Sequence, residues 1–216
     1  MKRSYERHLP HQIPERYPIF LTWNLKGAMP RKVWRMLQRE RERLERLPPR
    51  TGETTAERKL REDKMIFALS DQALDGATDG PMHLRDAAAA KIVEDSILFG
   101  VPERYDLFAW CVMSNHVHVL LTPKWELKDV THGIKGYTAL QINMLQEARG
   151  RVFWQDESYD HWARDVDELH RIIAYIENNP VVAGLCRKPD DWPWSSARFR
   201  DDWPPGEPFV KSTSGL

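Results

Sequence analysis

The sequence predicts an α+β protein with a ferredoxin-like βαββαβ core, in which an antiparallel sheet carries helices on one face. Runs of apolar, β-branched and aromatic residues predict strands at residues 17–26, 104–113, 116–122 and 152–164. Helical periodicity predicts helices at residues 30–47, 126–148 and 165–179. The order is therefore strand, helix, strand, strand, helix, strand, helix, which is the βαββαβ layout followed by a C-terminal helix.

The first half of the chain adds a helical insertion to this layout. The first strand (YPIFLTWNLK) ends at Gly27, and the first helix opens at Pro30 and stops before Pro48. Residues 50–100, between the first helix and the second strand, are expected to form the insertion, with helices at 56–74 and 86–98. Residues 1–16 are polar and contain prolines, so an extended lead-in is expected there.

The second half holds the remaining core elements. A short turn, Ser114-Asn115, joins the second and third strands in a hairpin. The last helix is expected to end at Pro180, because proline cannot donate a backbone hydrogen bond. We expect residues 1–200 to form one domain and residues 201–216 to form a C-terminal tail.

The composition is that of a charged protein of the cytoplasm. Of the 216 residues 30% are charged, and mean hydropathy is −0.62. No apolar run reaches the length of a membrane span, and the first residues lack the apolar core of a signal peptide. The two cysteines show no metal-ligand spacing and are expected to be reduced thiols. These features exclude a membrane partner.

A formal net charge of zero conceals a basic segment. Residues 26–50 contain nine Lys or Arg residues against three Glu residues. In the helix predicted here, cationic side chains recur on one face and are candidates for contact with a phosphate backbone: Lys32, Arg35, Arg39 and Arg43. The alternative is a solvated face with intrahelical pairs such as Glu42–Arg46.

The third strand contains two histidines in the stretch VMSNHVHVLL (residues 112–121). Side chains alternate along a strand, so Val117 and Val119 face the core while His116 and His118 share the opposite face. Neutral imidazoles two residues apart can chelate one divalent ion. The alternative is a pair of polar residues on the open side of the sheet.

The last helix (ELHRIIAYIENNP) offers further donors. Its apolar stripe includes Ile172 and Ile176, and Tyr175 and Asn179 lie four residues apart on the flank of that stripe. The amide oxygen is a possible metal ligand and the phenol a possible nucleophile. Alternatively, Tyr175 is a boundary tyrosine and Asn179 simply ends the helix.

Four stretches in this order resemble the REP-associated tyrosine transposases, relatives of the single-tyrosine insertion-sequence transposases in the HUH endonuclease superfamily. The stretches are MSNHVHVLLTP, FWQDESYDHWARD, YIENNPVVAGL and DWPWSSAR. The resemblance covers residues 4–200 and includes the opening segment RHLPHQIPERYPIFLTWNLKGAMP. It implies the HUH form of the ferredoxin-like fold with a catalytic C-terminal helix.

The resemblance also assigns the site. It implies that His116, His118 and Asn179 hold Mg²⁺ or Mn²⁺, and that Tyr175 is the nucleophile. Val117 takes the bulky apolar position between the histidines, and Ser114 stands where the family motif often has proline. Two other tyrosines are weaker alternatives for the nucleophile: Tyr137 and Tyr159.

The implied reaction cleaves single-stranded DNA beside a REP-type palindromic hairpin through a 5′-phosphotyrosine linkage. His161 and Arg164 of the YDHWARD stretch are further candidates for DNA contact, or else polar residues of an edge strand. The resemblance implies a nucleoid-associated protein that acts as a monomer or homodimer. Two alternatives stay open: a domesticated hairpin-binding protein that no longer cuts, and an unrelated metal-dependent hydrolase.

Overall fold

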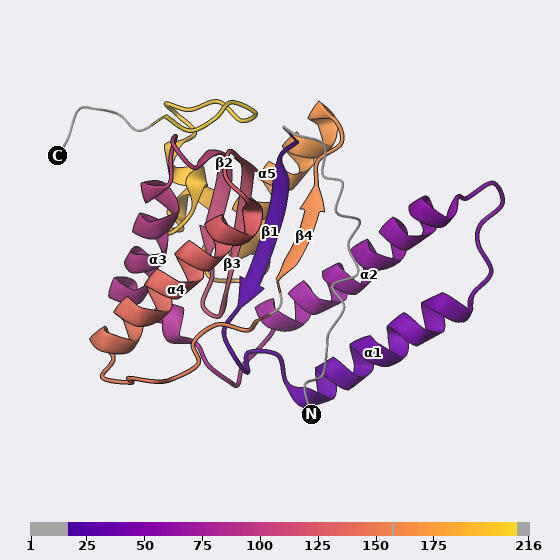
Figure 1. Cartoon of the computed structure of the whole chain (residues 1–216), viewed down its shortest axis with the longest axis horizontal. Coiled ribbons are helices and arrows are strands. Elements are labelled where there is room, and N and C mark those ends of the chain that lie inside the picture. Colours follow the sequence, from indigo (N-terminus) through magenta and orange to yellow (C-terminus); the bar gives the residue numbers. More distant parts are fainter. Residues whose placement is uncertain (1–16, 157, 211–216) are drawn as a thin grey trace.

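A four-stranded antiparallel sheet forms the centre of the computed structural model, which describes residues 17–156 and 158–210 (Figure 1). The expectation for residues 1–16 lies outside this range. The strands are β1 (Ile19–Asn24), β2 (Tyr105–Val112), β3 (His116–Pro123) and β4 (Tyr159–Trp162). The helices are α1 (Arg31–Arg46), α2 (Thr55–Asp75), α3 (Ala87–Phe99), α4 (Leu127–Leu145) and α5 (Val166–Val182).

The strand order β2-β3-β1-β4 confirms the predicted fold class. Each strand is antiparallel to its neighbour, with Thr22 of β1 opposite His118 of β3 and Tyr159 of β4. A crossover connection joins β1 to β2 and another joins β3 to β4. In the sheet β3 lies between β1 and β2, and β1 lies between β3 and β4. This interleaving of two crossovers is the βαββαβ arrangement.

The two faces of the sheet are covered by different helices. On one face Val117, Val119 and Leu121 pack with residues of α3 and α4. On the other face Phe20 and Leu120 pack against α5. The expected C-terminal helix therefore covers the opposite face from the two crossover helices, and both faces of the sheet are buried.

The crossover helix between β1 and β2 is α3, which lies within the segment expected to be an insertion. Ala89, Ala90 and Val93 of α3 are fully buried in the core, because this helix presents small and β-branched residues to the sheet. In contrast, α1 buries only Leu37 and Leu44 and packs on α2. The pair α1–α2 projects from the body of the molecule and is the true insertion (Figure 1).

Several element boundaries differ from the predictions, among them those of β4 and α5. Strand β4 is short, and Trp154 forms only an isolated bridge with Leu25, so the predicted strand at 152–164 is too long. Helix α5 continues through Pro180 to Val182, so the predicted end at Pro180 is wrong. A proline in the last turn removes a single backbone donor, and the amide of Ala183 still bonds to the carbonyl of Asn179.

The C-terminal segment lies along β2. The amide of Val112 donates to the carbonyl of Trp194, and the ring of Trp203 stacks on Trp110. None of the helices among the described residues combines the length and apolar character needed to cross a bilayer.

Candidate metal and nucleophile site

The two histidines of β3 lie in the interior of the protein. Their side chains are fully buried, because α2 and α5 cover the face of the sheet to which they point. The Nε2 atoms of His116 and His118 are 3.0 Å apart, so both rings present the same nitrogen to one point. The predicted pairing on one face is confirmed, but that face is not open.

Second partners hold each imidazole in place. The Nδ1 atom of His116 lies 2.6 Å from Oδ1 of Asn115. The amide nitrogen of Asn115 donates to the carbonyl of Leu74 at 2.9 Å, which fixes Oδ1 as the atom that faces the ring. An acceptor at this position requires a proton on Nδ1 of His116, and Nε2 then carries a free lone pair. The Nδ1 atom of His118 bonds to the hydroxyl of Thr22 at 2.8 Å.

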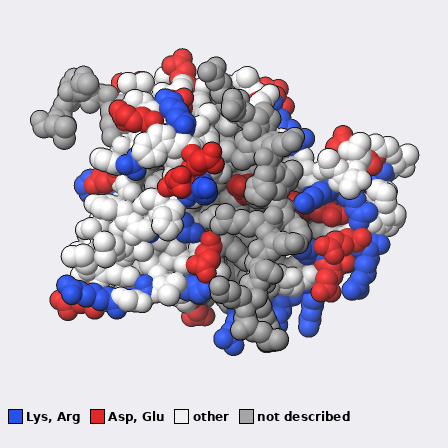
Figure 2. Space-filling model, in the orientation of Figure 1, with Lys and Arg blue, Asp and Glu red and all other residues white. Residues whose placement is uncertain are grey.

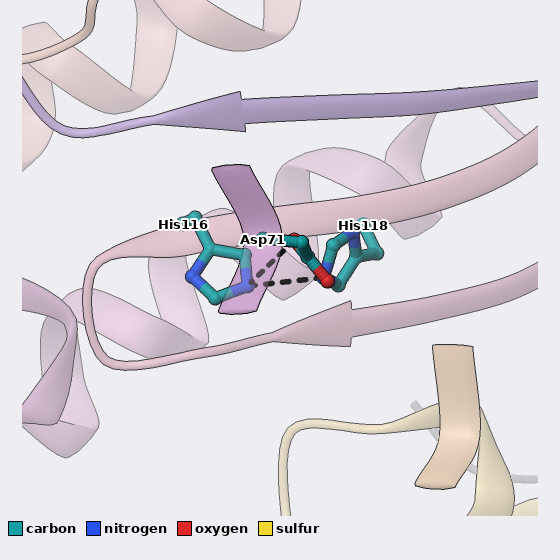
Figure 3. A group of neighbouring side chains, drawn as sticks. All are labelled: Asp71, His116 and His118. Carbon is teal, nitrogen blue, oxygen red and sulfur yellow. Dashed lines mark hydrogen bonds and ion pairs between the residues drawn. The ribbon is translucent and has the colours of Figure 1, made fainter. Parts of the chain in front are cut away.

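Helix α2 brings two carboxylates to the histidines. The Oδ1 atom of Asp71 lies 3.7 Å from Nε2 of His116 and 3.4 Å from Nε2 of His118 (Figure 3). The Oδ1 atom of Asp75, one helical turn further on, lies 3.6 Å from Nε2 of His116. Sequence reasoning missed both acids. The sequence contains one sign of a buried acid: Asp71 falls at the helical spacing of the apolar residues Phe67 and Leu74.

Helix α5 brings the predicted phenol and amide to the same place. The hydroxyl of Tyr175 donates to Oδ2 of Asp71. The amide nitrogen of Asn179 donates to the same oxygen at 3.2 Å, which leaves its Oδ1 for another partner. The structure therefore brings together His116, His118, Tyr175 and Asn179, with Asp71 at their centre.

The donor set fits a divalent cation. Within the described residues, Oδ1 of Asp71, of Asp75 and of Asn179 are buried without a hydrogen-bond donor. Burial of carboxylates without a counter-charge is costly, and a cation among these oxygens removes that cost. Ligands around an octahedral ion at about 2.1 Å lie roughly 3.0 Å apart. The two Nε2 atoms have this spacing, and Oδ1 of Asp71 lies slightly further from them, at 3.4 and 3.7 Å. Asp71, His116 and His118 form a group of this kind.

The pKa values of the histidines favour the neutral form that a metal ligand requires. Burial lowers the pKa of both imidazoles to about 3, and for His116 the neighbouring His118 contributes. Both rings are thus neutral ligands at physiological pH. Burial and the carboxylate of Asp71 raise the pKa of Asp75 to about 7. Burial and the same carboxylate raise the pKa of the Tyr175 phenol well above its usual value.

The other predicted site residues lie elsewhere. The basic residues of α1 have exposed side chains, and Arg43 pairs with Glu40 at 2.6 Å. Figure 2 shows Lys and Arg side chains, with acids between them, over the projecting pair α1–α2. His161 bonds to Glu168 at 2.9 Å, and Arg164 lies 3.8 Å from the same carboxylate. Contact of any of these residues with DNA stays a prediction.

Part of the chain, including most of this site, is similar to known transposases. Residues 101–179 match the family model described as "Transposase IS200 like". This part of the chain is therefore similar to IS200-like transposases. This segment includes both histidines, Tyr175 and Asn179, whereas Asp71 lies outside it.

One relative and one solved structure are similar to this chain. The REP-associated tyrosine transposase of Escherichia coli (strain K12) is 25% identical over 93 residues, which are 43% of this chain and 54% of that protein. The match therefore spans about half the length of that relative. A solved structure of a REP-associated tyrosine transposase bound to a REP hairpin aligns over 100% of this chain and 95% of its own, with 16% identity and a TM-score of 0.46. The resemblance to these transposases is confirmed.

Proposed function

We propose that this protein is a metal-dependent endonuclease and strand transferase for single-stranded DNA, which acts beside REP-type hairpins through a 5′-phosphotyrosine linkage. One observation carries the proposal: a buried histidine pair, the phenol of Tyr175 and the amide of Asn179 converge within the IS200-like segment. A phenol beside a metal site suits the transfer of a phosphoryl group to the protein.

In this proposal His116, His118 and Asn179 hold Mg²⁺ or Mn²⁺. The orphan Oδ1 of Asn179 and the free lone pair of His116 support these roles. When bound, the ion draws negative charge from the scissile phosphate and stabilises the departing oxygen.

Tyr175 performs the bond exchange. A phenol with a raised pKa holds its proton at neutral pH, so the proton leaves as the phenolic oxygen attacks phosphorus. The new bond joins that oxygen to phosphorus, the bond from phosphorus to the 3′ oxygen breaks, and the 3′ oxygen gains a proton. Attack by the free 3′-OH on the phosphotyrosine reverses the exchange, so cleavage and strand transfer need one site. Tyr175 is 39% exposed, which leaves its ring accessible to a substrate.

Recognition of DNA is assigned to the basic face of α1. The side chains of Lys32, Arg35 and Arg39 are exposed, and the relative with a solved structure is bound to a REP hairpin. Cationic side chains at this spacing suit a phosphate backbone. We assign the protein to the nucleoid, as a monomer or homodimer.

The test is the formation of a covalent adduct. We expect the protein with Mn²⁺ and a labelled single-stranded hairpin to give a protein–DNA band that resists denaturation. Tyr175→Phe should abolish the band, because the nucleophile is lost. Tyr137→Phe should retain it, because Tyr137 lies on α4, which packs on the face of the sheet opposite to the histidines.

Three other results would redirect the assignment. Hairpin binding without a band in the wild-type protein would indicate a DNA-binding protein that no longer cuts. Cleavage that releases a free 5′-phosphate and survives Tyr175→Phe would indicate an unrelated hydrolase. A band that survives Tyr175→Phe but not Tyr159→Phe would move the nucleophile to β4.

A further inference from the structure

The acid at the centre of the site comes from outside the segment that matches the transposase family. Asp71 lies on α2, in the projecting insertion, and its side chain is buried. We propose that Asp71 joins the metal to the nucleophile: Oδ1 is a metal ligand, and Oδ2 holds the hydroxyl of Tyr175. The inference rests on the proposed function and adds an insertion-borne residue to it.

The environment of Oδ1 supports the role of ligand. This oxygen faces the Nε2 atoms of both histidines, at 3.4 and 3.7 Å, and has no donor among the described residues. Asp75, whose Oδ1 lies 3.6 Å from Nε2 of His116, is a second acid and supplies no positive charge. A buried carboxylate that faces two neutral imidazoles without a cation is unfavourable. A divalent ion would balance the charge and accept a lone pair from each of the three side chains.

The environment of Oδ2 supports the role of positioning residue. It accepts from the hydroxyl of Tyr175 and from Nδ2 of Asn179. The second bond turns Oδ1 of Asn179 away from Asp71, with no donor of its own. One carboxylate therefore orients both functional residues of α5, and it bridges them to the histidines of β3.

Contacts other than those of Asp71 hold α2 against the sheet. Lys64 pairs with Glu168 of α5 at 2.6 Å, and the carbonyl of Leu74 accepts from Asn115. The ring of Phe67 stacks on Tyr159 at a centroid distance of 4.0 Å. Because these contacts persist when Asp71 is replaced, Asp71→Asn is expected to fold with α2 in place.

The experiment measures Mn²⁺ binding without DNA, from the electron paramagnetic resonance signal of the free ion. We expect Asp71→Asn to weaken Mn²⁺ binding by roughly 100-fold or more, because loss of a direct ligand should cost at least as much as loss of a hydrogen-bond partner of a ligand. Asp63→Asn is the matched control, with the same substitution two turns earlier on α2, and should bind within two-fold of wild type. Tyr175→Phe should also bind Mn²⁺ like wild type, because it removes a neighbour of Asp71 and no ligand.

Thermal unfolding with and without Mn²⁺ tests whether Asp71 is a metal ligand or has a purely structural role. Without metal, Asp71→Asn should unfold at the wild-type temperature or above it, because a buried repulsion between carboxylates is removed. With saturating Mn²⁺, wild type should gain stability and Asp71→Asn should gain little. At Mn²⁺ concentrations that restore occupancy, the adduct should still form at least ten-fold more slowly in Asp71→Asn, because Tyr175 has lost its charged acceptor.

The outcomes separate this inference from the proposed function. Wild-type Mn²⁺ affinity in Asp71→Asn would overturn the role of ligand, even if the wild-type protein forms the adduct. Loss of stability in metal-free Asp71→Asn, with metal binding unchanged, would make Asp71 a structural residue. Mn²⁺ binding that requires Asp71, in a protein that never forms an adduct, would support the ligand and refute the proposed reaction.

Discussion

At the scale of single residues, the site depends on groups that fix the histidines as much as on the histidines themselves. The side-chain oxygen of Asn115 accepts a hydrogen bond from Nδ1 of His116, and the amide nitrogen of Asn115 donates to the carbonyl of Leu74. The turn before β3 therefore has a chemical role as well as a geometric one, since it sets the tautomer that leaves Nε2 free.

We expect Asn115→Ala to weaken Mn²⁺ binding about 10- to 100-fold, the effect typical of a lost partner of a metal-bound histidine. The measurement is a Mn²⁺ titration of the folded variant. Ser114→Ala, in the same turn, is the control and should leave the affinity unchanged. Equal affinities of Asn115→Ala and wild type would show that the ring of His116 is held by the strand alone.

The sequence was sufficient to predict the residues of this site that follow local rules. The alternation of β3 placed His116 and His118 together, and helical spacing placed Tyr175 beside Asn179. Asp71 could not be predicted, because its contact with Tyr175 joins residues 104 positions apart through the docking of α2. No local pattern encodes which face of a sheet a projecting helix covers.

At the scale of elements, one acid ties three of them together. Glu168 accepts hydrogen bonds from Lys64 of α2, His161 of β4 and the backbone amide of Arg164 before α5. Burial opposes ionisation of this carboxyl, but the hydrogen bonds outweigh it and lower the pKa of Glu168 to about 2. The predicted DNA-contact residue His161 thus also has a structural partner.

This acid makes stability depend on pH in a defined direction. The folded pKa of about 2 lies below the usual 4.5, so the stabilisation is complete above about pH 4.5 and is lost as pH falls towards 2. We expect Glu168→Gln to lower the free energy of unfolding at pH 7 by about 1–2 kcal/mol. The melting temperature should then fall by about 2–8 °C.

The same comparison at low pH provides the check. Thermal unfolding at pH 3 should show a smaller difference between Glu168→Gln and wild type than at pH 7. Asp167→Asn is the neighbouring control, because Asp167 is exposed, and its effect at pH 7 should be small. A difference that does not depend on pH would mean that Glu168 acts through packing.

The elements themselves were predictable to different degrees. The hairpin β2–β3 begins and ends within one residue of its prediction, because strand residues and a short turn agree. The crossover helix was assigned to α1 instead of α3, because both have helical periodicity and only packing separates them. The apolar residues of α3 reach the core, whereas among the described elements α1 packs mainly on its neighbour α2.

At the scale of the whole molecule, charge is unevenly distributed despite a formal net charge of zero. Helix α1 belongs to the projecting pair α1–α2 and carries exposed cations on its outer surface (Figures 1 and 2). Among the described residues, no ion pair involves Lys32, Arg35 or Arg39. These cations are therefore available to a polyanion.

We expect the double variant Arg35→Ala, Arg39→Ala to bind hairpin DNA more weakly and with a lower dependence on salt. Each lost phosphate contact lowers the slope of log K against log[salt] by about 0.7–0.9, so the slope should change by roughly 1.4–1.8. Lys91→Ala is the control, because Lys91 lies on α3 and pairs with Asp95. An unchanged slope would exclude this face of α1 from DNA contact.

The donors around His116 and His118 come from segments far apart in the chain, and this has a consequence for folding. Thr22 and His118 are separated by 96 residues, and Asp71 and Tyr175 by 104. Such long-range contacts form late, since chain closure must come first. A metal ion therefore has no complete site until the sheet and both covering helices are in place. The binding energy of an ion held there would act mainly on the rate of unfolding, and hardly on the rate of folding.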